Sequence, residues 1–104
     1  MTRNESILKL LDEKKAENIE LINLNNSGYF VDNVIIATIA STKQALALID
    51  DIKILVKDFN DKVLYEESSE DWSVLDLGDA LIHLMSSAYR EKYQIEKFLS
   101  EFKH

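Results

Sequence analysis

Two carboxylates and an imidazole lie close together within Trp72–Met85, which reads WSVLDLGDALIHLM. Asp76 and Asp79 flank a Leu-Gly pair, and His83 follows in the same segment. Such a set could bind a divalent metal ion or act as an acid–base pair. Turn formation also explains both aspartates, because Asp side chains accept hydrogen bonds from nearby backbone N–H groups. We favour the turn interpretation, and we expect His83 to be a structural residue whose hydrogen bonding is satisfied within the fold.

The same segment predicts a β-hairpin. The expected strands are Trp72–Leu77 and Ala80–Met85, reversed at Gly78-Asp79. Glycine adopts positive φ at no steric cost, and large apolar or β-branched residues flank the turn on both sides. Because side chains alternate along a strand, Val74 and Asp76 should share one face, and Leu75 and Leu77 should share the other.

Three helices are predicted around this hairpin. Ser/Thr-x-x-Glu/Gln capping boxes begin at Thr2 and Ser41, and apolar residues recur at helical spacing behind each. Ser41 therefore has a structural explanation, and it lacks the Gly-x-Ser-x-Gly setting of a nucleophile. The predicted helices are Asn4–Ala16, a four-turn helix from the Ser41 cap to Phe59, and Ser87–Lys103, either unbroken or as two short helices that meet near Gln94.

The remaining strands differ in their polarity patterns. Ile19–Leu24 mostly alternates, as a half-buried strand does, whereas Val34–Ala40 is almost wholly apolar and predicts a central strand parallel to a neighbour. Lys62–Glu66 is a short predicted strand, and Glu67–Asp71 a polar loop. The order α-β-β-α-β-β-β-α predicts one α/β domain over residues 1–104, with a mixed five-stranded sheet and helices on its faces.

The charge balance favours a protein partner over a nucleic acid. Twelve Lys and Arg stand against 19 Asp and Glu, a net charge of −7. Nucleic-acid binding relies on clustered cations, so we expect little or no direct contact with RNA or DNA. Cysteine is absent, and no signal peptide or membrane-spanning run is visible, so we expect a cytoplasmic protein without disulfides. We expect no cofactor and no metal, since no glycine-rich phosphate loop is present.

Trp72 is the only tryptophan and has two interpretations. It could fill the core, or it could anchor a partner, because aromatic residues dominate binding hot spots. We expect the hairpin to lie at a sheet edge, where unpaired backbone groups are available to a partner. The residues alone therefore indicate an acidic α/β domain that binds rather than catalyses.

The hairpin sequence closely resembles the signature of the ribosome silencing factor family, also called Iojap-like. In that family a Trp opens a strand that ends in an Asp-aromatic-Gly-Asp turn, and an apolar strand containing His follows. The resemblance extends over nearly the whole chain, and it rests on the order and spacing of the similar segments. Besides the hairpin they are Asp12–Ile19, Asp32–Thr38, Ser41–Gln44 and Tyr89–Glu96.

The resemblance implies a factor that binds the large ribosomal subunit through ribosomal protein L-fourteen. There it would sterically block association with the small subunit and repress translation under nutrient limitation. It also implies a fold similar to nucleotidyltransferases without their catalytic apparatus, hence no enzyme activity. The partner-binding residues that we expect on this basis are Trp72, Ser73, Leu75, Asp76, Leu77 and Asp79.

Two alternatives remain at this point. One is a degenerate or metal-dependent nucleotidyltransferase-like enzyme that would use Asp76 and Asp79 with magnesium. The other is a homodimeric adaptor whose exposed hairpin edge pairs with its own copy. The chain also departs from the family pattern, with Ile39 where glycine is usual and Leu77 where an aromatic residue is usual.

Overall fold

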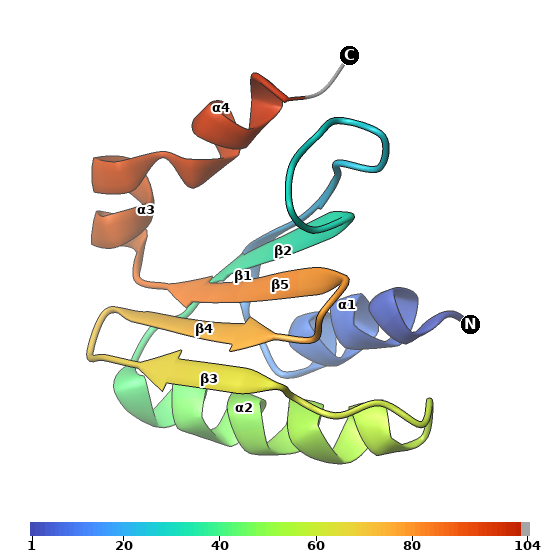
Figure 1. Cartoon of the computed structure of the whole chain (residues 1–104). Helices are drawn as coiled ribbons and strands as arrows, with labels where there is room; N and C mark the ends of the chain where they lie inside the picture. Colours follow the sequence, from blue (N-terminus) through green and yellow to red (C-terminus); the bar gives the residue numbers. More distant parts are fainter. Residues whose placement is uncertain (103–104) are drawn as a thin grey trace.

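The computed structural model describes residues 1–102, and these form a five-stranded mixed sheet with helices on both faces (Figure 1). The strand order is β1-β2-β5-β4-β3, so the fold class expected from the sequence is confirmed. The elements are α1 (Arg3–Glu13), β1 (Glu17–Asn23), β2 (Asn33–Thr38), α2 (Thr42–Lys57), β3 (Tyr65–Ser68), β4 (Trp72–Asp76), β5 (Ala80–Met85), α3 (Ser87–Tyr93) and α4 (Ile95–Ser100).

The centre of the sheet is the pair of parallel strands β2 and β5. They run in register from Asn33 opposite Ala80 to Thr38 opposite Met85, and all other strand pairs are antiparallel. Both strands are buried almost throughout, which explains why their sequences are nearly continuous apolar runs. The prediction of a central, parallel strand near Val34–Ala40 is therefore confirmed.

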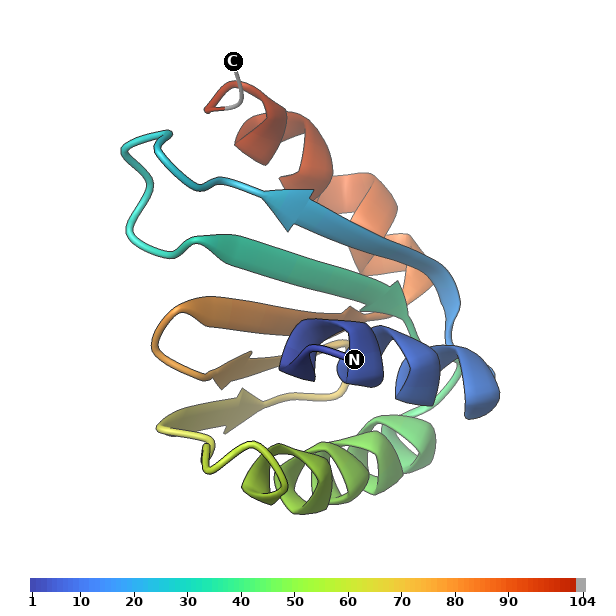
Figure 2. The ribbon, with the colours of Figure 1, turned by 90° about the vertical axis from the view of Figure 1, so that its right-hand side faces the viewer.

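Each face of the sheet has its own apolar cluster. On one face α1 and α2 pack against alternate residues of β2, β4 and β5, including the fully buried Ile35, Leu75 and Ile82. On the other face α3 and α4 contribute Tyr89 and Leu99 to a smaller cluster. Figure 2 shows α4 beside β1 and α2 beside β3, at opposite ends of the strand order.

Local signals fix the starts of α1 and α2 where the sequence predicted them. Thr2 and Glu5 form the complete capping box of α1, and the Ser41 side chain accepts the Gln44 N–H at the start of α2. The helix α1 ends before the predicted Ala16, because Lys15 adopts a positive φ of 72°.

The C-terminal segment consists of two short helices, one of the two predicted arrangements. Gln94 is the junction between α3 and α4, and it adopts the left-handed conformation with φ 44°. Lys103, the predicted end of this helical segment, lies outside the described residues. No helix within residues 1–102 has the length and apolar character needed to cross a membrane.

Two expectations about the hairpin's surroundings are wrong. First, the strand predicted at Lys62–Glu66 is displaced to Tyr65–Ser68, so part of the predicted polar loop is strand. A tight turn in which the Ser69 N–H donates to the Trp72 carbonyl (3.0 Å) closes the β3–β4 hairpin and sets this register. Second, the hairpin β4–β5 lies inside the sheet, because β3 covers one side of it and β2 the other.

Candidate partner-binding face

The β4–β5 turn is held by its own aspartate. The Asp76 carboxylate accepts the Gly78 N–H at 2.7 Å, and Gly78 adopts a φ of 94°. This is the Asx-type bond expected from a turn residue, and the positive φ explains why glycine occupies the position. The turn interpretation of Asp76 is confirmed.

Asp79 is tied to the start of the chain through Arg3. The Arg3 guanidinium contacts Asp79 at 2.9 Å and Asp61 at 2.7 Å, and its side chain is only 11% exposed. The ion pairs join α1, the loop after α2 and the hairpin turn. Asp79 thus serves the fold, while its own side chain stays 53% exposed at the surface.

His83 is a buried, neutral residue. Its Nδ1 accepts the indole N–H of Trp72 at 3.0 Å, and burial lowers its pKa from 6.5 to about 4. The structural role expected of His83 is confirmed. Among residues 1–102 no group of three His, Asp or Glu side chains could hold a metal ion.

Three of the predicted partner-binding residues point into the core on the side of α1 and α2. Ser73 is 1% exposed, Leu75 is fully buried, and Leu77 is 4% exposed. Their side chains therefore do not reach the surface, and alternation along β4 is the reason. Partner binding through these residues stays a prediction. In this conformation their side chains would act on a partner only indirectly, by packing against the core and so fixing the shape of the hairpin.

The opposite side of β4 and β3 presents a different set of side chains. Tyr65 lies opposite Asp76 and Glu67 lies opposite Val74, so these residues project from one face together with the tryptophan. Tyr65 is 58% exposed, Glu67 is exposed, and the others are partly exposed. We call this surface the open half-face; it consists of Tyr65, Glu67, Trp72, Val74 and Asp76.

Trp72 lies at the boundary between the apolar core and the surface. Its ring packs at 5.2 Å from the Tyr93 ring of α3, and it borders the smaller apolar cluster. Yet it is only partly buried and lines a surface pocket. The hydrogen bond to His83 fixes the orientation of the indole, so a large aromatic surface is held rigid beside β3.

Glu67 gives the open half-face a negative charge. The Tyr65 hydroxyl donates to the Glu67 carboxylate at 3.2 Å, and the nearby charge raises the pKa of Tyr65. No lysine or arginine of the described chain forms an ion pair with Glu67. The partner-binding residues predicted from the sequence did not include Tyr65 or Glu67. The available signal was the spacing of Tyr65 and Glu67, which are two residues apart and therefore share one face of a strand. It becomes visible only if the predicted strand is extended through the acidic residues.

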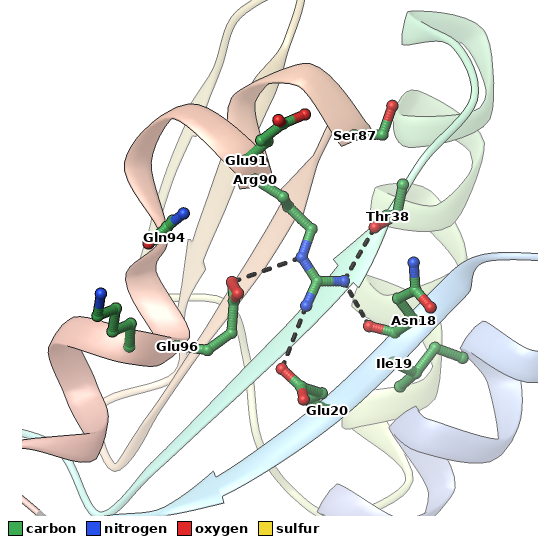
Figure 3. Close-up of a pocket in the computed structure, with 10 residues that line it drawn as sticks. Asn18, Ile19, Glu20, Thr38, Ser87, Arg90, Glu91, Gln94 and Glu96 are labelled. Carbon is green, nitrogen blue, oxygen red and sulfur yellow. Dashed lines mark hydrogen bonds and ion pairs between the residues drawn. The ribbon is translucent and has the colours of Figure 1, made fainter.

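A second surface feature, a cleft of about 680 Å³, lies between α3, α4 and β1 (Figure 3). Arg90 lines the cleft and donates to the Asn18 carbonyl and to the Thr38 hydroxyl (2.9 Å). The same guanidinium pairs with Glu20 at 3.2 Å and Glu96 at 3.5 Å. The protein's own ion pairs therefore line the cleft, and they fasten the C-terminal helices to the sheet.

The fold and these surfaces define a small mixed-sheet α/β protein that presents a rigid aromatic and acidic sheet face. Comparison with known proteins makes the assignment specific. The family model described as "Ribosomal silencing factor during starvation" matches residues 2–104. The chain therefore belongs to the ribosomal silencing factor family, as the resemblance predicted.

Relatives and solved structures agree with this assignment. The chain is 34% identical over 95 residues to the ribosomal silencing factor RsfS of Haemophilus influenzae, covering 89% of this chain and 93% of the relative. It is 30% identical over 98 residues to that of Bacillus subtilis, covering 88% and 83%.

A crystal structure from Bacillus halodurans superimposes with a TM-score of 0.76 at 26% identity, covering 91% of this chain and 90% of that one. One from Chromobacterium violaceum gives 0.85 at 24% identity, covering 94% and 83%, and supports the fold alone.

Proposed function

We propose that this protein binds the large ribosomal subunit through ribosomal protein L-fourteen and thereby blocks association with the small subunit. The observation that carries the proposal is the open half-face, together with the family membership. A rigid Trp72 beside the unneutralised Glu67 offers an apolar anchor and a negative charge on one surface. The net charge of −7 would steer such a surface toward a basic protein.

Repression in this proposal is steric and needs no chemical turnover. A folded protein bound at the face where the subunits meet would prevent their joining and lower translation under nutrient limitation, in the cytoplasm. The competing magnesium-dependent enzyme has less support, because the Asp76 carboxylate is engaged by Gly78 and that of Asp79 by Arg3. The similarity of the fold to nucleotidyltransferases, which the family resemblance implies, stays a prediction.

The homodimeric alternative also changes. Pairing through an exposed edge of the β4–β5 hairpin is excluded in this topology, because both strands already have two neighbours. The outer strands of the sheet are β1 and β3. Whether free molecules dimerise through another surface is a separate matter that sedimentation at several concentrations measures.

The direct test is co-sedimentation with separated large and small ribosomal subunits at low and moderate salt. We expect pelleting with the large subunit only, weaker but still present at the higher salt, since screening reduces only the electrostatic part. A second arm mixes the subunits with and without the protein and measures joined ribosomes on a gradient. Absence of pelleting with either subunit, or unchanged joining at saturating protein, would contradict the proposal.

A further inference from the structure

A pocket of about 300 Å³ lies on the open half-face next to Trp72. Its walls come from β3, the β3–β4 turn and β4, and the residues that line it are Glu67, Ser68, Ser69, Trp72 and Val74. The turn is held by Ser69, whose hydroxyl donates to the Trp72 carbonyl at 2.9 Å. The pocket is therefore built on backbone-bonded strands and a fixed turn, which favours recognition without rearrangement.

The charge of this pocket is not balanced within the described chain. Some carboxylates of the described chain are neutralised internally, since Arg3 pairs with Asp61 and Asp79 and Arg90 pairs with two glutamates. The adjacent Glu66, which faces α2, pairs with Lys53. Among residues 1–102, Glu67 has only the neutral hydroxyl of Tyr65 as a partner. The pocket thus combines a fixed indole with a carboxylate that lacks a cation.

This combination favours one chemical group. A guanidinium is planar, stacks on an indole and donates paired hydrogen bonds to a carboxylate, whereas an ammonium is a compact and strongly hydrated charge. The Trp72 indole N–H is already donated to His83, so its ring can act only through its π surface and edges. A cation is therefore a better match for this pocket than a group that needs a hydrogen-bond donor from the indole.

We infer that the pocket between Glu67 and Trp72 binds the guanidinium of an arginine side chain on the macromolecular partner. The inference rests on the proposed function for the identity of that partner, but the pocket itself can be tested without it. Glu67 would accept the charged hydrogen bonds, and Trp72 would stack on the guanidinium. Neither Glu67 nor the serine residues that line the pocket were among the partner-binding residues predicted from the sequence.

The first experiment titrates the free protein with N-acetyl-arginine amide and follows intrinsic fluorescence. Trp72 is the only tryptophan, so the signal reports on this pocket. We expect a saturable change with the arginine probe and none with the uncharged N-acetyl-citrulline amide. Equal responses to the two probes would overturn the inference, and equally tight binding of N-acetyl-lysine amide would overturn its choice of guanidinium.

The variant Glu67→Gln tests the carboxylate, with Glu66→Gln as the matched control. Both changes remove one negative charge from adjacent residues of β3, but only Glu67 lines the pocket. We expect Glu67→Gln to weaken the arginine probe about tenfold, as loss of a charged hydrogen bond does, and Glu66→Gln to leave it unchanged. Equal effects of the two variants would show general electrostatics and contradict the pocket.

The same pair of variants separates this inference from the proposed function. In co-sedimentation with the large subunit we expect weaker pelleting of Glu67→Gln and wild-type pelleting of Glu66→Gln. If wild-type protein pellets and Glu67→Gln pellets equally well, the pocket inference fails while the proposed function stands. If wild-type protein does not pellet, the proposed function fails, and the arginine titration still decides whether the pocket binds a guanidinium.

Discussion

The two halves of the sheet face that carries α3 and α4 differ in what covers them. Over β1 and β2, the helices α3 and α4 complete an apolar cluster around Val34, Ile36 and Leu99, and Arg90 fastens them in place. Over β4 and β3, the open half-face leaves Trp72 partly exposed and Glu67 exposed, with the Tyr65 hydroxyl as its hydrogen-bond donor. On the covered half Arg90 pairs with Glu20 and Glu96, whereas on the open half-face Glu67 forms no ion pair with a described residue.

This contrast also runs along single strands. In β4 the side chains alternate between the core beneath α1 and α2 and the open half-face. Leu75 and Trp72 are therefore close in sequence but belong to different surfaces. Substitutions that separate stability from partner binding can consequently be chosen within one strand, and the predictions below use that fact.

The largest expected effect is on the core side of β4. Leu75→Ala should lower the free energy of unfolding by about 4 kcal/mol, because the side chain is fully buried and its removal leaves a cavity. Chemical denaturation measures this loss. Val74→Ala, a partly exposed neighbour on the open half-face, should cost about 1 kcal/mol. A Leu75→Ala loss as small as that of Val74→Ala would contradict the assignment of faces.

The next effect concerns acid stability. His83 has a pKa of about 4 when folded against an ordinary 6.5 when unfolded, so the unfolded chain binds more protons between these values. The contribution of His83 to the free energy of unfolding is therefore fully present above pH 6.5. It should fall by as much as about 3 kcal/mol as the pH drops to 4.

The control for this pH effect is His83→Gln, compared with wild type by denaturation across the same pH range. The variant should be less stable at neutral pH, because it loses the acceptor of the Trp72 indole N–H. It should also lack the His83 part of the pH slope. Parallel slopes for the two proteins would show that His83 does not titrate in the way inferred.

A smaller effect is expected where the covered half is fastened. Arg90→Gln should cost about 2 kcal/mol, because it removes a mostly buried guanidinium from two carboxylates and a backbone carbonyl. Lys53→Gln breaks the more exposed pair with Glu66 and should cost under about 1 kcal/mol. Thermal unfolding ranks the two, and the reverse order would contradict the role given to Arg90.

Much of this fold could be predicted because its signals are local. The capping box at Thr2, the Ser41 N-cap, the apolar run of β2 and the Asp76 turn each depend on nearby residues alone. Alternation also predicted correctly that Val74 and Asp76 share one face and that Leu75 and Leu77 share the other. What it could not indicate was which of the two faces a helix would cover.

The parts that could not be predicted depend on long-range pairing. The strand order, which places the hairpin inside the sheet, is decided by which strand completes each edge, and no local pattern encodes it. Arg3 and Arg90 look like ordinary helical surface residues in the sequence, yet they join carboxylates from distant elements. The Glu67 pocket was missed for the same reason, since it forms only when β3 pairs with β4.

The measurement that tests the account most directly is the affinity of Trp72→Ala for the large ribosomal subunit. Ile54→Ala is the control, because Ile54 is an exposed apolar residue on α2, away from the open half-face. With folding verified by circular dichroism, we predict that Trp72→Ala binds about thirtyfold more weakly, a loss of about 2 kcal/mol, and that Ile54→Ala binds as wild type does. A folded Trp72→Ala protein that binds the subunit unchanged would contradict the claim that the open half-face is the docking surface.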